Sequence, residues 1–415
     1  MRRPGKSSPA KLSADSQRLV MLSQATVLSS SRLEEQSWER HLDGLVQKML
    51  KGGNQDGIEA ALDELFKEQS AAYDVLMDAL EAGSESCRIE YEGVSYDALL
   101  IAMPILAWTR FNIASGAIAP DMIATLSAHL YAHVLASGAR MAMAPTLFSI
   151  DQLPRSHVET LTLTQRLAHA AVKQESLKAS GKAPETAPFL ADTRYLLAAV
   201  AVPAGAPLFH WQSELNLNDR NLALEQWRNQ ATPNIARLLP GCGIELLLPE
   251  AYYIACREAD KLIRPASIRA AAHYLTHTLG ALPAELGAAI GGFSEAPEDG
   301  RVDEYRIGFT LRNEPEVIYG VVWPLYGEED DENRAAATDA AGRPMTAIEY
   351  AGKTPIEQIV GLLQAAGITK IKLHDERFVL EYCDDCGAPL YPDMEAELVH
   401  AEMPEDAPAG PGHLH

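Results

Sequence analysis

Cysteine is scarce in this sequence. Five cysteines occur among 415 residues, and their spacing is irregular. Domains that depend on disulfides carry an even and much denser set of cysteines. We therefore exclude a disulfide framework and expect a reducing compartment, the cytoplasm. The isolated Cys87, Cys242 and Cys256 are expected to pack as small apolar residues.

A long apolar run is also missing. The longest run, from Ala98 to Trp108, has 11 residues and contains Pro104, whereas a helix needs roughly 20 apolar residues to cross a bilayer. Residues 1–16 lack the apolar core of a secretory signal. We expect no membrane span and no export, and we interpret the run as part of a buried helix over residues 96–110.

Positive charge is in short supply. Lys and Arg number 35 against 57 Asp and Glu, which gives a net charge of −22. Binding to nucleic acid depends on cations that neutralise phosphates, so nucleic acid is not an expected partner. The basic residues Arg2, Arg3, Lys6 and Lys11 lie in residues 1–12, which we expect to be a flexible, solvated tail.

Three common catalytic motifs are absent. The sequence has no Walker loop, no dinucleotide-binding fingerprint at the start of a helix and no Gly-x-Ser-x-Gly nucleophile elbow. The glycines of 287–293 do not have the spacing of such a loop. These absences make an enzyme less expected without excluding one.

Hydrophobic periodicity predicts an α+β protein. Apolar residues that return every three or four positions predict an all-helical domain over 13–172, interrupted by one short strand at Cys87–Tyr91. Residues 173–189 are rich in Lys, Ser, Gly and Pro and are interpreted as a linker. An α+β domain with a mixed sheet is expected over 190–380, followed by an acidic tail over 381–415.

The α+β region repeats one order of elements. Residues 194–248 and 304–374 each read as hairpin, helix and strand, with the first hairpin turning at Pro203-Ala-Gly and closing at 207–212. One interpretation is an internal duplication whose copies share one continuous sheet with a cleft between them. Chance similarity of two ordinary α+β units is the alternative.

The most specific local motif is Cys383-Asp384-Asp385-Cys386-Gly387. Two residues between the cysteines allow both thiolates to reach one metal ion, and the glycine permits a tight turn. The motif is similar to half of a zinc ribbon, so we expect structural zinc. His400 and His413 are the expected remaining ligands, with His415 and His374 as further candidates.

Two other interpretations of the cysteine pair stay open. The cysteines can be unligated, or they can cycle between dithiol and disulfide. The negative charges of Asp384 and Asp385 argue against the redox pair, because they disfavour the nucleophilic thiolate.

Two histidine pairs have helical spacing. His129 and His133, and likewise His273 and His277, would each place two imidazoles on one helix face, where they can chelate a metal. Neither pair carries the glutamate of a zinc-protease helix. Hydrogen-bonded packing is the more ordinary interpretation, and we prefer it.

Three stretches of sequence together resemble a family. They are Met103-Pro-Ile-Leu-Ala-Trp-Thr-Arg-Phe, Leu238-Leu-Pro-Gly-Cys-Gly-Ile-Glu-Leu-Leu-Leu-Pro and Tyr382-Cys-Asp-Asp-Cys-Gly-Ala-Pro-Leu-Tyr-Pro. The resemblance is to an uncharacterised bacterial family, domain of unknown function 2863. It implies a bacterial cytoplasmic protein and supplies no catalytic residue.

These observations favour a non-catalytic protein that binds a small molecule or another protein and carries a structural zinc site. The alternative is an enzyme that acts on a small molecule in the cleft of the α+β domain. Its polar candidates are His210, Trp211 and Glu250, because they lie near the ends of expected strands, where sites are often found. Packing and solvation are the ordinary roles of these three residues.

Overall fold

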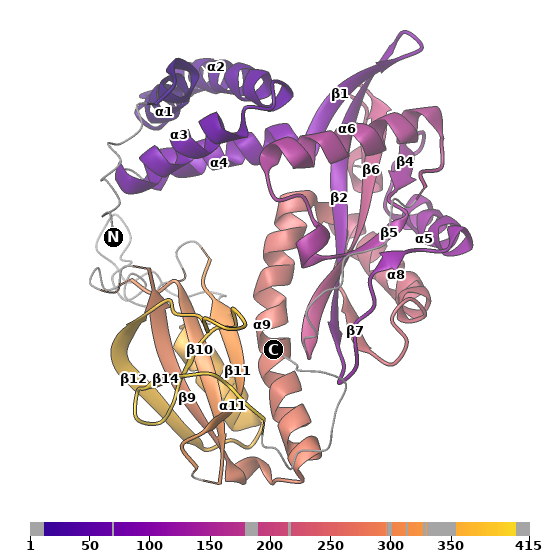
Figure 1. The fold of residues 1–415 in the computed structure, drawn as a ribbon. Coiled ribbons are helices and arrows are strands. Elements are labelled where there is room, and N and C mark those ends of the chain that lie inside the picture. The colour runs from indigo at the N-terminus through magenta and orange to yellow at the C-terminus, as the bar shows by residue number, and fades with distance from the viewer. Residues whose placement is uncertain are drawn as a thin grey trace.

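The structure is a computed structural model that describes residues 12–68, 70–178, 190–214, 217–295, 297, 301–312, 314–326, 329 and 354–403. A group of helices comes first, and two larger sheets follow, with one long helix between them (Figure 1). The α+β class is confirmed. The expected basic tail falls almost entirely on residues 1–11, outside the described residues.

Four helices open the chain: α1 (Ala14–Val27), α2 (Arg32–Lys51), α3 (Gln55–Glu68) and α4 (Ser70–Glu85). The side chains of Ser13 and Ser31 accept hydrogen bonds from backbone N–H groups in the first turns of α1 and α2, which satisfies donors that a helix start leaves free. The apolar faces of the four helices meet in one core, which Leu161 of a later helix joins.

A large antiparallel sheet follows. Its order is β1-β2-β6-β5-β3, with β4 also on β6, and β7 and β8 also on β2. The strands are β1 (Ser86–Tyr91), β2 (Val94–Trp108), β3 (Gly116–Ala117), β4 (Arg140–Met143), β5 (Thr146–Ser149), β6 (Ala191–Pro203), β7 (Gly243–Leu246) and β8 (Glu250–Ala251). The short helix η1 (Ile150–Gln152) follows β5. The strand expected at Cys87–Tyr91 is confirmed as β1.

The helix expected over residues 96–110 is wrong, because this segment forms β2. Helices cover both faces of the large sheet: α5 (Pro120–His133) and α8 (Leu217–Ala236) on one, α6 (His157–Lys173) and α9 (Tyr252–Leu279) on the other. A strand buried on both faces has no polar side, so its sequence reads as one apolar run. Pro104 lies between the stretches of β2 that pair with β8 and with β7.

The large sheet also crosses the expected linker. β2 and β6 are neighbours from the pair Tyr96↔Pro203 to the pair Trp108↔Ala191, although one precedes and the other follows residues 173–189. The extent of the expected all-helical domain is therefore wrong from Ser86 onward. Residues 179–189 of the linker lie outside the described residues.

The second sheet is mixed and has the order β11-β10-β9-β12. Its strands are β9 (Leu286–Ser294), β10 (Glu304–Leu311), β11 (Val317–Pro324) and β12 (Lys370–Val379), and the short helix η2 (Pro283–Glu285) precedes them. β12 runs parallel to β9, and the other pairs are antiparallel. The second half of α9, together with α11 (Pro355–Ala365), covers one face of this sheet.

The expected continuous sheet of two copies is wrong, because the two sets of strands lie in separate sheets. The second copy has the expected hairpin, helix and strand, but residues 207–212 run into a helix, α7 (His210–Glu214). The side-chain oxygen of Gln212 accepts the N–H groups of Leu208 and Phe209, which favours a helix start over a strand at this point.

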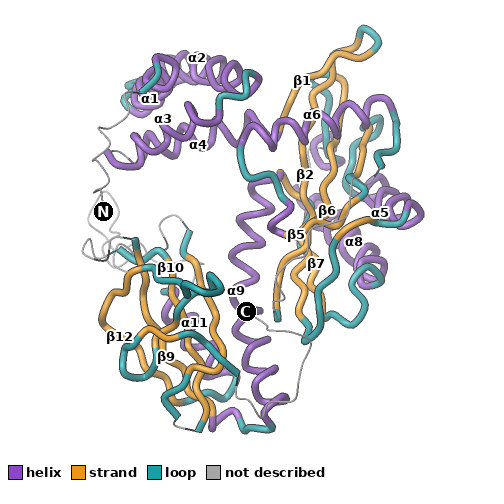
Figure 2. Tube along the Cα trace, in the orientation of Figure 1, coloured by secondary structure: helices purple, strands orange, loops and turns teal. Residues whose placement is uncertain are grey.

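The C-terminal segment 380–403, which we call the strap, crosses the other face of the second sheet. The N–H of Leu380 donates to Ser294 of β9 (3.2 Å), and the N–H of Glu402 donates to Val317 of β11 (2.9 Å). The strap contains the strands β13 (Tyr391–Pro392) and β14 (Leu398–Val399). Most of it is loop, teal in Figure 2.

Glycine makes room for the strap. A methyl group at Gly320 would overlap the ring of Tyr391, and one at Gly308 would lie 2.5 Å from the carbonyl oxygen of Pro392. The strap therefore packs directly on the backbone of β10 and β11. No helix among the described residues combines the length and the apolar character that crossing a membrane requires.

Candidate metal centre

The Cys383-x-x-Cys386 motif forms a tight turn on a short ladder. Tyr382 and Pro389 form an antiparallel bridge, and the N–H of Cys383 donates to the carbonyl of Ala388 (2.8 Å). The N–H of Gly387 donates back to Cys383 (2.8 Å), and Gly387 has a φ of +73°. Glycine adopts such a φ without strain, so its place after the second cysteine has a local cause.

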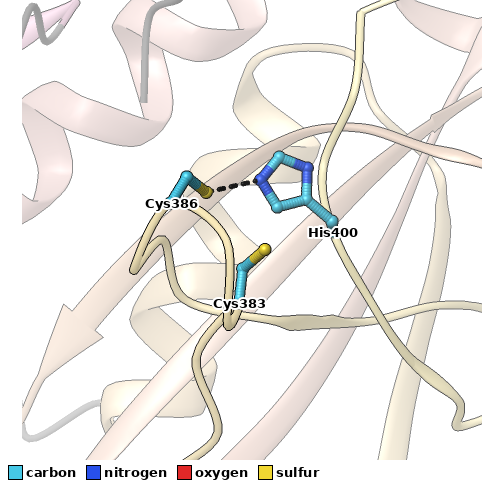
Figure 3. A group of neighbouring side chains, drawn as sticks. All are labelled: Cys383, Cys386 and His400. Atoms are coloured by element: carbon cyan, nitrogen blue, oxygen red, sulfur yellow. Dashed lines mark hydrogen bonds between the residues drawn. The ribbon is translucent and has the colours of Figure 1, made fainter.

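His400 reaches the turn from the far end of the strap. It follows β14, which pairs with β13 through Tyr391↔Val399. The sulfur atoms of Cys383 and Cys386 and a ring nitrogen of His400 all lie within 4.8 Å of one another. The Cys386 Sγ and the His400 Nε2 are 3.2 Å apart (Figure 3). These three residues lie close enough to bind one metal ion.

The spacing of the three atoms fits a tetrahedral ion. Zinc–sulfur bonds of about 2.3 Å and zinc–nitrogen bonds of about 2.0 Å place two sulfurs ~3.8 Å apart and a sulfur and a nitrogen ~3.5 Å apart. The Cys386 Sγ and the His400 Nε2, at 3.2 Å, lie a few tenths of an ångström closer than this, and all three atoms lie within 4.8 Å of one another.

The backbone of the turn favours a thiolate at Cys383. The N–H groups of Cys386 and then of Asp385 donate to its sulfur and lower the pKa of the Cys383 thiol, while the charge of Asp385 opposes them more weakly. On the other ligand, the Glu402 carboxylate lies 3.5 Å from the His400 Nδ1. The His400 Nδ1 makes no hydrogen bond at this distance, but a carboxylate so placed is near the position from which it orients a histidine ligand and leaves Nε2 toward the metal.

The other histidines expected at the site lie elsewhere. His374 of β12 is buried, and its Nε2 bonds to the carbonyl of Asp393 (2.7 Å). The Asp393 side chain in turn accepts the N–H groups of Glu395 (2.8 Å) and Glu397 (2.9 Å). His374 therefore supports the bend between β13 and β14. His413 and His415 lie outside the described residues.

One imidazole of each histidine pair forms a hydrogen bond, while the buried Nε2 of His133 has no partner among the described residues. His129 on α5 lies 3.1 Å from the side-chain nitrogen of Asn234 on α8. The Nδ1 of His277 lies 2.8 Å from the carbonyl of His273, and the two rings are 4.0 Å apart. Across the part of the chain that the structure describes, neither pair lies with a third metal-ligating side chain.

Two of the three polar candidates for an enzyme meet at one arginine. The guanidinium of Arg220 lies 5.9 Å from the Trp211 ring centroid and 2.9 Å from the Glu250 carboxylate. The Trp211 ring also stacks on Phe209, with 4.9 Å between centroids. His210 is exposed at the start of α7. This arrangement is a surface ion pair beside stacked rings.

The three isolated cysteines are at least half-buried in their surroundings. Burial raises the pKa of Cys87 to about 11 and that of Cys256 to about 12, and it raises the pKa of Cys242 as well. A thiol with a raised pKa is a poor nucleophile at neutral pH, because the thiolate is the reactive form.

The sequence interpretation missed Arg306 and Glu402. Arg306 of β10 is fully buried and donates to the carbonyls of Glu381 and Leu390 at the base of the turn (2.6 and 2.8 Å). A cation in an alternating strand is a weak signal, because it usually marks the solvated face. The spacing His400-x-Glu402 was the only sign of the carboxylate beside His400.

The comparisons with known proteins point to one family. The model of a protein family of unknown function, DUF2863, matches residues 4–414. No curated protein and no solved structure matches the chain. Because the match covers nearly the whole chain, the protein belongs to the DUF2863 family.

Proposed function

We propose that this protein holds a structural zinc ion through Cys383, Cys386 and His400, with His413 as the fourth ligand. The convergence of two sulfurs and one imidazole nitrogen within 4.8 Å carries the proposal. These residues come from two ends of the strap, 14 positions apart for the pair Cys386 and His400. An ion bound by all of them would close the strap into a loop.

The donor atoms favour zinc. Thiolate sulfur is a soft ligand that selects zinc over calcium and magnesium, which prefer oxygen. Two thiolates with two imidazoles form a common closed zinc site. The carboxylates of Asp384 and Asp385 are exposed beside the turn and lower the electrostatic cost of bringing in a dication.

The role of the ion is structural in this proposal. The strap is mostly loop, and the segment from Phe378 to His415 contains no Lys or Arg for ion pairing. Binding free energy of a metal that holds two parts of such a segment together becomes folding free energy. The ion would thus stabilise the strap on the second sheet.

At the level of the whole protein, we propose a cytoplasmic, non-catalytic protein that binds a small molecule or another protein. Raised pKa values at Cys87, Cys242 and Cys256 support the absence of a thiol nucleophile among them. A net charge of −22 supports a partner other than nucleic acid.

Elemental analysis tests the metal. Untagged protein purified without chelator should contain about one zinc per chain, since one closed site binds one ion. The Cys383→Ser, Cys386→Ser double variant should contain none, and Cys242→Ser, which removes a cysteine outside the site, should contain as much as the wild type. Zinc well below one equivalent, or zinc retained in the double variant, would refute the proposal.

A further inference from the structure

Arg306 joins the second sheet to the base of the candidate metal turn. Its side chain has no exposed surface. The Nε donates to the Glu304 carboxylate (2.6 Å), and the Nη1 donates to the carbonyls of Glu381 (2.6 Å) and Leu390 (2.8 Å). Two of the three hydrogen-bond partners therefore lie in the strap.

These two carbonyls belong to residues that face each other. The N–H of Leu390 donates to Glu381 (3.1 Å), one step outside the bridge between Tyr382 and Pro389. The next step of the same ladder is Cys383, the first expected ligand. Arg306 thus holds both sides of the ladder that ends in the Cys383–Cys386 turn.

Two aromatic rings lie next to the guanidinium. Its central carbon lies 4.4 Å from the Phe293 ring centroid in the sheet and 5.0 Å from the Tyr382 ring centroid in the strap. Arginine stacks well on aromatic faces, and such contacts strengthen when the cation is shielded from water. Tyr382 is covalently joined to Cys383, so this contact also acts next to a ligand.

His400 is anchored through a different strand. The strap runs back to β11, where the N–H of Glu402 bonds to Val317 (2.9 Å). The cysteine half of the ligand set is therefore fixed to β10 and the histidine half to β11. The affinity for a metal depends on how these two halves are held relative to each other, because a misplaced ligand must be moved at a free-energy cost.

We propose that Arg306 is a positioning residue of the metal centre, which holds the Cys383–Cys386 turn on the sheet in the orientation that faces His400. This inference rests on the proposed zinc site. It assigns a share of the metal affinity to a side chain that is not a ligand. A purely structural role in the sheet would leave the affinity of the folded protein unchanged.

Zinc affinity is the decisive measurement. Apoprotein of the wild type, Arg306→Met and Tyr382→Leu is titrated with zinc against a chromophoric chelator, and folding is checked by tryptophan fluorescence, to which Trp323, buried in the second sheet, contributes. Supporting groups around metal ligands typically contribute about 10–100-fold to affinity, which is the loss expected for Arg306→Met. Loss of one stacked ring in Tyr382→Leu should weaken binding about two- to five-fold.

Arg312→Met is the matched control. Arg312 directly follows the same strand, but its side chain is half-exposed and pairs with Glu285, away from the strap. Its substitution should leave the zinc affinity unchanged. The absorption of bound cobalt(II) provides a second readout, which should change in Arg306→Met because the ligand geometry changes.

The outcomes separate the two proposals. A wild-type protein that binds no zinc refutes the proposed site itself. A wild-type protein that binds zinc, together with folded Arg306→Met of equal affinity and an unaltered cobalt spectrum, overturns only the positioning role. If Arg306→Met does not fold, Tyr382→Leu decides, because the Tyr382 side chain is 52% exposed and its loss spares the core. Unchanged affinity in that variant then counts against the inference.

Discussion

The carboxyl group of Asp260 on α9 is partly buried, which disfavours its charged form. Burial raises its pKa to about 6 from 3.8, and the nearby cation Arg264 offsets this only in part. Arg264 is already engaged by the Glu329 carboxylate (2.7 Å) and by the carbonyl of Pro324 (2.6 Å). Asp260 therefore remains poorly compensated when it is charged.

We predict that Asp260→Asn raises the free energy of unfolding at pH 8. A folded-state pKa above the unfolded value means that the folded protein prefers the protonated acid, so the wild type loses stability as the pH rises from about 4 to about 6. The free-energy cost of burying the charged Asp260 then persists at higher pH. Its removal by Asp260→Asn should raise the free energy of unfolding by about 1–2 kcal/mol after allowance for solvent screening.

Urea unfolding at pH 8 and at pH 4 checks this prediction. The gain from Asp260→Asn should be much smaller at pH 4, where the wild-type acid is protonated in the folded state and only partly ionised in the unfolded state. Asp375→Asn, a change at an exposed position of β12, serves as the control. An equal gain at both pH values would show that the charge of Asp260 is not the cause.

At the scale of elements, the contact between the strap and the second sheet depends on the absence of side chains. Gly320 lies under the ring of Tyr391, and Gly308 lies against the backbone of Pro392. Close packing on these glycines thus holds the strap on the sheet, in addition to Arg306 and the proposed metal. Overpacked interiors typically lose about 1–3 kcal/mol of stability.

We predict that Gly320→Ala displaces Tyr391 and exposes the strap to cleavage. Trypsin cannot report this, because no Lys or Arg follows Arg377. Glutamyl endopeptidase can, since Glu381, Glu395 and Glu397 lie in the strap. The rate of its first cut in the strap should rise in Gly320→Ala.

Gly44→Ala provides the matched control for this substitution. Gly44 lies inside α2 with open space where the methyl group would stand. Alanine should raise stability by about 0.5–1 kcal/mol there and leave strap cleavage unchanged. Equal cleavage rates in both glycine variants would argue against the close fit of Tyr391.

Elements with one polar face were predictable from the sequence. The helices α1 to α4 have separate apolar and polar sides, and all four lie in the region that was predicted to be helical. β2 and β6 are both buried on two faces and have no polar side. β6 was recognised because the turn at Pro203-Ala-Gly marks its end, whereas the Ala, Leu and Met residues of β2 are also good helix formers.

The residues of the candidate metal site likewise include some that could be predicted from the sequence and some that could not. The cysteine spacing is local and needs no knowledge of the fold, and His400 was within reach of it along the chain. Arg306 could not be recognised, because the strap that covers its face of β10 begins more than 70 residues later. Contacts of that kind leave no periodic pattern in the sequence.

At the scale of the whole molecule, the large sheet ties together residues on both sides of the expected linker. Lys173 and Lys178 are exposed before the part of the linker that lies outside the described residues. We predict that mild trypsin treatment cuts between 173 and 189. The two fragments should stay associated, because β2 and β6 pair along their length and share two buried cores.

Gel filtration after the digestion checks this. The nicked protein should elute with the intact chain and separate only in denaturant. Two fragments that elute apart under native conditions would contradict the pairing of β2 with β6, and first cuts elsewhere would contradict the linker.

The number of residues in helix α9 determines how the large sheet and the second sheet are oriented relative to each other. Its first part packs on the large sheet through Tyr252, Ala255 and Ala259, and its second part packs on the second sheet through Ile268 and Leu275. Each residue of a helix advances the chain by about 1.5 Å and turns it by about 100°. One residue inserted between these parts would rotate the second sheet, the strap and the Cys383–Cys386 turn through that angle relative to the large sheet. Insertions or deletions in this stretch should therefore be tolerated best when they add or remove close to one full turn, about 3.6 residues. The length of α9 thus sets the orientation of the second sheet relative to the large sheet.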